Sequence, residues 1–174
     1  MLGKFCSKSI SLLSVIFVLC FVGNASAVNI TTNATVVSAV TVAEVTPLDF
    51  GSFVPDPVGD TITFNAGGTI AAGSGATVLL GGEVGGVAST NGPTLGSTVQ
   101  VFVTGGNIAS GVNTMAVQVN CLGPGGALGT LDGSCTFTSA GGLESVQIGG
   151  VLTVAPAQPA GAYTGFVSVT AGFF

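Results

Sequence analysis

Apolar and polar side chains alternate along most of the chain after residue 27, which is the pattern of half-buried β-strands. The alternation is most regular in the last stretch, Gly161–Phe174. The apolar face of this stretch carries Tyr163, Val167, Val169, Ala171 and Phe173. Threonine and serine residues occupy most of its other face. A strand of this kind needs other segments to cover its apolar face and to pair with its backbone.

The same alternation predicts further strands over residues 61–64, 76–84, 98–104, 115–121, 135–138 and 144–154. Gly149 and Gly150 predict a bulge or a hairpin within the last of these, and the stretch Gly85–Gly96 is predicted to be a loop. Leu48 and Phe50 share a face and are predicted to anchor the core. No stretch has the three- and four-residue spacing of a helix. Eight or nine short strands separated by Gly, Pro and Asn turns predict an all-β, immunoglobulin-like sandwich of two sheets.

Residues 28–45 alternate over a length that exceeds the usual 5–6 residues of a strand. Two arrangements explain this length. In one, a free N-terminal extension (residues 28–38) precedes the first strand of a domain that comprises residues 39–174. In the other, a single bent strand runs along one edge of the sandwich.

The first 27 residues have the three parts of a secretory signal peptide. Lys4 and Lys8 form a basic start, Ile10–Val22 is an apolar run, and Ala25–Ala27 supplies a cleavage site with small residues. The apolar run is shorter than the roughly 20 residues that a membrane span needs. We therefore expect the protein to be exported through the periplasm, to the cell surface or the medium.

The chain after residue 27 contains no Lys, Arg or His, and its side chains carry a net charge of −7. The carboxylates are Glu44, Asp49, Asp56, Asp60, Glu83, Asp132 and Glu144. Binding to nucleic acid or to anionic lipid requires cations that are missing here. A serine or cysteine nucleophile would lack its histidine base. Asp56 and Asp60 flank a turn but fall far short of an EF-hand ligand set. We therefore predict no enzyme activity, no cofactor and no metal site.

Two cysteines, Cys121 and Cys135, remain once the signal peptide is removed. In an exported protein an even pair of cysteines predicts one disulfide. A zinc site would need further Cys or His ligands, which the chain after residue 27 does not contain.

Two segments of the chain resemble a known group of exported proteins. Leu48–Gly51 (LDFG) and Val151–Thr170 (VLTVAPAQPAGAYTGFVSVT) are similar to the two ends of chaperone–usher-type pilins, namely the major subunit of the common (Mat/Ecp) pilus and the spore-coat-protein-U-like proteins. The resemblance implies an immunoglobulin-like fold that lacks one strand. It also implies three partners: a periplasmic chaperone, an outer-membrane usher and neighbouring copies of the same chain.

The resemblance assigns roles to residues at both ends of the mature chain. The side chains of the strand donated to a neighbour would be Val28, Ile30, Thr32, Ala34 and Val36. The strand that accepts it, and the chaperone before it, would use Tyr163, Val167, Val169, Ala171 and Phe173. Backbone pairing would give affinity, and alternate side chains would enter pockets.

Two functions of different classes follow. The first is a structural subunit of a bacterial surface fibre that is assembled by exchange of donor strands and supports adhesion. The second is a self-complete secreted or surface β-sandwich, serving as a coat or adhesive module, in which the N-terminal segment pairs within its own chain. The sequence leaves open whether residues 28–38 pair in cis or in trans.

Overall fold

The computed structural model describes residues 39–73, 75, 77–91, 94–126 and 128–173. In this part of the chain there are thirteen strands and no helix, and all strand pairings are antiparallel. The strands are β1 (Thr41–Thr46), β2 (Ser52–Val54), β3 (Asp60–Asn65), β4 (Thr69–Ala72), β5 (Val78–Gly81), β6 (Gly86–Asn91), β7 (Thr98–Thr104), β8 (Gly106–Ser110), β9 (Asn113–Leu122), β10 (Ser134–Thr138), β11 (Glu144–Val154), β12 (Thr164–Gly165) and β13 (Ser168–Phe173). The prediction of an all-β, sandwich-like fold is confirmed. The described residues include no helix long and apolar enough to cross a membrane.

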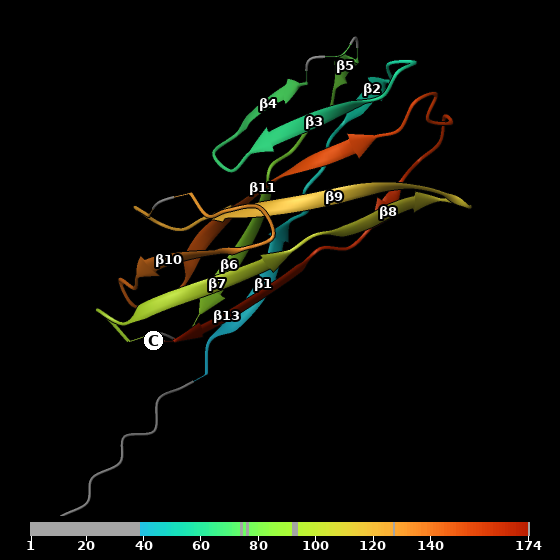
Figure 1. Cartoon of the computed structure of the whole chain (residues 1–174). Helices are drawn as coiled ribbons and strands as arrows, with labels where there is room; N and C mark the ends of the chain where they lie inside the picture. Colours follow the sequence, from blue (N-terminus) through green and yellow to red (C-terminus); the bar gives the residue numbers. More distant parts are fainter. Residues whose placement is uncertain (1–38, 74, 76, 92–93, 127, 174) are drawn as a thin grey trace, which may run out of the picture. The chain divides into compact units, whose positions relative to one another are not determined.

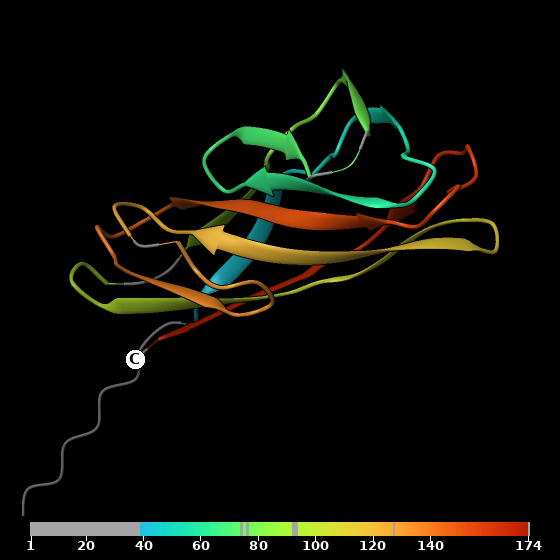
Figure 2. The same cartoon turned by 45° about the horizontal axis from the view of Figure 1, so that its top comes forward.

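The strands form a large sheet, a three-stranded sheet and a two-stranded ribbon (Figure 1). The large sheet has the order β1-β6-β11-β9-β8-β12, and the hairpin β3–β4 joins it through β11. The three-stranded sheet has the order β10-β7-β13, and β2 pairs with β5 in the ribbon. Figure 2 shows the β10-β7-β13 sheet as a layer beneath β9 and β11. Buried side chains from both sheets make one hydrophobic core.

The central strand β11 runs without a bulge, so the predicted interruption at Gly149 and Gly150 is wrong. One edge of β11 pairs with β9 from Gln147 to Thr153, while the other edge passes from β6 to β3 at Gly149. A Cβ atom on Gly149 would lie 2.2 Å from the backbone nitrogen of Ala66. These glycines therefore allow the neighbouring backbones to approach β11 closely.

The stretch Gly85–Gly96, predicted to be a loop, contains β6. The buried face of β6 carries Gly86, Ala88 and Thr90, and the small size of these side chains conceals the apolar alternation. A Cβ atom on Gly86 would lie 3.1 Å from the Cβ atoms of Leu48 and Ile148. The lack of a side chain at this position therefore lets β6 pack tightly.

Two other predicted strands are shorter than expected. The predicted strand over residues 76–84 is reduced to β5, because Gly81 and Gly82 adopt φ angles of +94° and +87°. The last stretch is divided into β12 and β13 around Phe166, where the pairing partner changes from β8 to β7. The short strands β2, β4 and β8 were not predicted. The prediction that Leu48 and Phe50 anchor the core is confirmed, since Phe50 is buried and Leu48 packs against the core.

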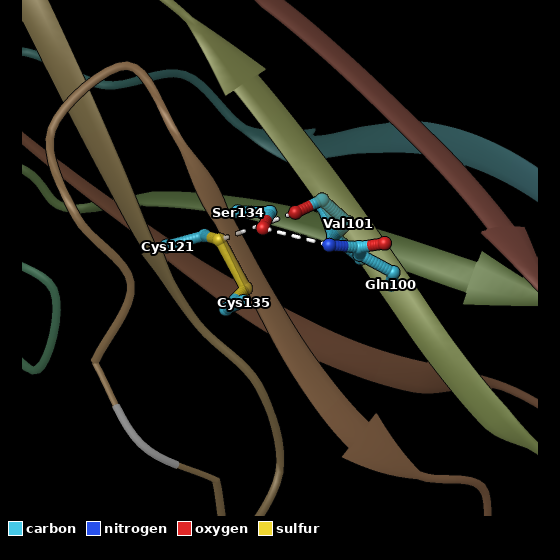
Figure 3. Close-up of a disulfide and its surroundings, with 5 residues drawn as sticks. All are labelled: Gln100, Val101, Cys121, Ser134 and Cys135. Carbon is cyan, nitrogen blue, oxygen red and sulfur yellow. Dashed lines mark hydrogen bonds between the residues drawn. A yellow bond between two sulfur atoms is a disulfide. The ribbon is translucent and has the colours of Figure 1, made fainter. Parts of the chain in front are cut away.

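A disulfide joins Cys121 of β9 to Cys135 of β10, as predicted (Figure 3). The two Cα atoms lie 5.8 Å apart, within the usual range for this bond. Beside it, the Nε2 atom of Gln100 donates a hydrogen bond of 2.9 Å to the Oγ atom of Ser134. The disulfide therefore fastens the edge strand of the small sheet to the large sheet, on the side away from β13.

Candidate functional site

A groove of about 1150 Å³ lies between residues 42–55 and residues 158–169. The first segment contains most of β1 and all of β2, and the second contains β12 and the start of β13. The floor of the groove is apolar and consists of Ala88, Ile108, Met115, Val117, Ile148 and Leu152. The volume exceeds the roughly 300–1,000 Å³ of most small-molecule pockets. Because two long segments of chain form its walls, the groove suits an extended peptide.

The strand β13 forms one wall of this groove and is paired on one edge only. Its partner is β7, and no strand in the described part of the chain pairs with its other edge. Such an edge presents a row of N–H and C=O groups that can pair with another strand. The groove thus combines an apolar floor with an unpaired strand edge.

The core is incomplete on the side of β13. In the neighbouring strand β7, the inward side chains of Val99, Val101 and Val103 are at most 1% exposed. The inward side chains of β13, among them Val169 and Ala171, are only partly buried although they face the same core. Apolar residues on the inner face of a sandwich are normally covered by the opposite sheet. Along the groove, the apolar side chains on the inner face of β13 lack this covering layer.

The structure brings together three of the five residues that were predicted to accept a strand. Tyr163, Val167 and Val169 line the groove. Ala171 packs against the core and Phe173 is partly buried, but neither lines the groove. Nearby, β1 and β13 contact each other. The part of β13 that lines the groove is therefore its first part.

Tyr163 is held in place by two hydrogen bonds at one end of the groove. Its hydroxyl donates to the carbonyl oxygen of Pro159 at 2.8 Å and accepts from the Nε2 atom of Gln158 at 2.8 Å. The ring packs against the core. Tyr163 is thus a fixed part of the wall, as its predicted core-facing position suggests.

Phe166 is a groove residue that the analysis of the sequence treated only as an exception to the alternation. It lines the groove, yet 94% of its surface is exposed. The two preceding residues form β12, so Phe166 lies where the chain passes between sheets. In the sequence, Phe166 could have been singled out because it is an aromatic residue at a position where the alternation calls for a polar one.

Two carboxylates, Glu44 and Asp49, also line the groove, and no cation balances them because the chain after residue 27 has none. Asp49 accepts a hydrogen bond of 2.8 Å from the backbone N–H of Gly51. Coulomb repulsion therefore disfavours acidic peptides in this groove and favours uncharged or basic ones.

Asp56 and Asp60 lie in the turn before β3 and at the start of β3. The Oδ1 atom of Asp56 accepts from the backbone N–H of Val58 at 3.0 Å. The Oδ1 atom of Asp60 accepts from the N–H of Thr61 at 2.7 Å, and this bond lowers the pKa of that carboxyl below its usual value. No group of three or more metal-binding side chains occurs among the described residues. Both carboxylates thus accept hydrogen bonds from backbone N–H groups of neighbouring residues.

The predicted signal peptide, residues 1–27, and the predicted extension, residues 28–38, lie outside the described residues. The predicted donor residues Val28, Ile30, Thr32, Ala34 and Val36 belong to this part. The described residues thus contain the accepting side of the predicted interaction only.

One protein family matches the described domain along almost its whole length. The profile of a "Domain of unknown function (DUF4402)" covers residues 40–173. The chain belongs to the DUF4402 family. The DUF4402 match begins one residue after the predicted domain start at Ala39. No curated protein and no solved structure shows significant similarity to the chain.

Proposed function

We propose that this DUF4402 protein is a structural subunit of a bacterial surface fibre, and that its groove accepts residues 28–36 of a neighbouring copy. The observation that supports the proposal most directly is the uncovered inner face of β13 beside an unpaired strand edge. A single added strand would cover this face and pair with this edge. The proposed fibre supports adhesion.

The composition of the proposed donor fits the groove. The side chains of residues 28–36 carry no charge, so they avoid repulsion by Glu44 and Asp49. Nine residues extend for about 30 Å as a strand. Val28, Ile30 and Val36 fall on one face of the strand, and full burial of each such side chain contributes about 1.5–3 kcal/mol. Alternate residues would thus cover the floor while the backbone pairs with β13.

Assembly of this kind requires protection of the groove before the neighbour arrives. An exported subunit with an uncovered apolar groove and an unpaired edge is prone to aggregate. We propose that a periplasmic chaperone occupies the groove first and that an outer-membrane usher delivers the subunit to the growing fibre.

Two complementary variants of the mature chain test the proposal. Ile30→Asp places a charge on the inward face of the donor and leaves the groove intact. Val167→Asp places a charge in the groove and leaves the donor intact. Neither variant is expected to polymerise alone, whereas a mixture forms discrete heterodimers because one working donor and one working groove remain. Size-exclusion chromatography and electron microscopy measure the products.

Thr31→Asp is the matched control, because Thr31 falls on the opposite face of the donor. This variant is expected to form fibres like the unaltered protein. The proposal fails if Ile30→Asp assembles as well as Thr31→Asp, or if the mixture yields no heterodimer although both variants are folded by circular dichroism.

One observation supports the second function, a self-complete module. Strands β1 and β13 of the same chain already contact each other. In that case the unaltered mature chain remains a monomer, and Ile30→Asp destabilises that monomer instead of blocking polymerisation.

A further inference from the structure

We propose that successive copies in the fibre touch directly through two apolar surfaces, in addition to the donated strand. Phe166 of one copy would contact Leu95 and Leu143 of the next. This inference rests on the proposed function and adds the orientation of the copies and a second contact between them.

The register of the strands places Leu95 and Leu143 at one end of the domain and Phe166 in the connection just before β13, beside Gly106. At one end, which we call the loop end, β1 begins opposite Asn91 and β13 finishes opposite Val99. The connections β6–β7 and β10–β11 also lie there, joined by the hydrogen bond from the N–H of Gly96 to the carbonyl of Ser139 at 2.8 Å. At the other end, the turn end, β8 turns into β9 and β11 finishes. Both views show the β8–β9 turn far from the end of β13 (Figures 1 and 2).

Each end displays large apolar side chains that are almost fully exposed. At the loop end, Leu95 is 78% and Leu143 is 74% exposed. The two connections that carry them are in contact, since a Cβ atom on Gly141 would lie 3.7 Å from that of Leu95. At the turn end, Val112 in the β8–β9 turn is 96% exposed. Between the two ends, Phe166 in the β12–β13 connection is 94% exposed. Groups of such residues mark surfaces that bind a partner.

The covalent connection between donor and domain forces the copies together. Only residues 37–40 separate the donor from Thr41, the first residue of β1. Five fully extended Cα steps span at most about 18 Å. The loop end of the donating copy must therefore lie beside whichever end of the neighbour's groove holds Val36.

The direction of the donated strand decides which ends meet. A donor antiparallel to β13 brings Val36 toward the start of β13, so that Leu95 and Leu143 face Phe166 of the neighbour. A donor parallel to β13 brings the two loop ends together and leaves Phe166 exposed. All pairings in the described domain are antiparallel, and antiparallel pairing is slightly more stable per residue. The exposed apolar residues and the pairing rule favour the same direction.

This direction determines the kind of assembly. Contact between Phe166 of one copy and the loop end of the next is heterologous and does not close, so copies add indefinitely. Contact between two loop ends is isologous and gives a closed pair by reciprocal exchange. Few charges oppose the heterologous contact, because Glu144 at the loop end is buried and accepts a hydrogen bond from the hydroxyl of Ser139.

Crosslinking between single cysteines tests the arrangement. The mature variants Leu143→Cys and Phe166→Cys are mixed and treated with a short bismaleimide. The native cysteines do not react, because they form a buried disulfide. We expect crosslinks between the two variants and no crosslinks within either variant alone. Leu131→Cys replaces Leu143→Cys as the matched control, because Leu131 is exposed in the β9–β10 connection, on the edge away from β13.

The possible results are distinct. Crosslinks within Leu143→Cys alone would mean that two loop ends meet, and would overturn the proposed direction. Fibres without any crosslink between Leu143→Cys and Phe166→Cys would overturn the proposed contact while leaving the donor strand intact. A different result would show that the proposed function itself is wrong. In that case the mixture of Ile30→Asp and Val167→Asp gives no heterodimer, and the proposed contact between copies is then also wrong. A Leu143→Ser variant, which is altered outside the groove, supports the contact if it still donates its strand to Ile30→Asp but forms at least tenfold fewer fibres.

Discussion

Removal of the disulfide should cost this domain a substantial part of its stability. Cys121 and Cys135 are 14 positions apart, so the bond closes a loop of about 15 residues, for which chain entropy predicts about 3 kcal/mol at 25 °C. The estimate assumes a flexible loop in the unfolded chain. The loop fits this assumption, because five of the thirteen residues between the cysteines are glycine. Typical domains have 5–15 kcal/mol in total.

The measurement compares three forms of the mature protein by urea unfolding. They are the oxidised protein, the reduced protein, and the double variant Cys121→Ala/Cys135→Ala. The reduced protein should unfold with a free energy about 3 kcal/mol below that of the oxidised protein, since only the crosslink is lost. The double variant should lose a further amount, because both sulfur atoms are buried in the core and their removal leaves a cavity.

The comparison between the last two forms separates the crosslink from the packing. The reasoning is refuted if reduction lowers the free energy of unfolding by less than 1 kcal/mol, while the double variant loses several kcal/mol. The stabilisation would then come from the buried sulfur atoms and not from the closed loop. The slope of the unfolding free energy against urea must stay comparable for this comparison to hold.

Three other predictions follow from single features of the chain. Gly149→Ala should destabilise the fold by more than about 3 kcal/mol or prevent folding, because the new Cβ would lie 2.2 Å from the nitrogen of Ala66; thermal unfolding measures the loss. Asp132 is partly desolvated, which raises its carboxyl pKa, but hydrogen bonds from the N–H groups of Val119 and Gly105 outweigh this and lower the pKa overall. The resulting stabilisation is present above the unfolded pKa of about 3.9 and is lost as the pH falls through the lower folded pKa; Asp132→Asn should therefore flatten stability profiles below about pH 4. Residues 28–174 contain no Lys or Arg, so trypsin should leave the denatured mature chain uncut in mass spectrometry.

The fold class could be predicted from the sequence because most core strands use large β-branched residues. Val99, Val101 and Val103 alternate with polar or outward residues, and this pattern specifies both the strand and its buried face. The strand β6 could not be found in this way, because Gly86 and Ala88 contribute little apolar signal. Their size makes sense only beside β11 and Leu48, which are distant in the sequence.

The candidate site was only partly predictable for a similar reason. The alternation at the C-terminus identified Tyr163 and Val167, since both belong to one local segment. The opposite wall and the floor, such as Phe53 and Ile108, come from segments that meet only through long-range pairing. The carboxylate of Glu44 in the groove likewise follows from the packing of β1 and not from any local motif.

The unpaired edge of β13 raises the question of how the protein avoids indiscriminate sheet pairing. Many proteins protect such edges with lysine side chains, but this chain has no lysine after residue 27. Protection of the β13 edge must therefore come from restricted access to that edge. Val167 and Val169 face a groove with a second wall, and β1 contacts β13 nearby. We expect these walls to admit a single extended strand and to obstruct the edge of another complete sheet, which would meet β1 and β2 first. The groove that we propose to accept a donor would then also exclude broader partners.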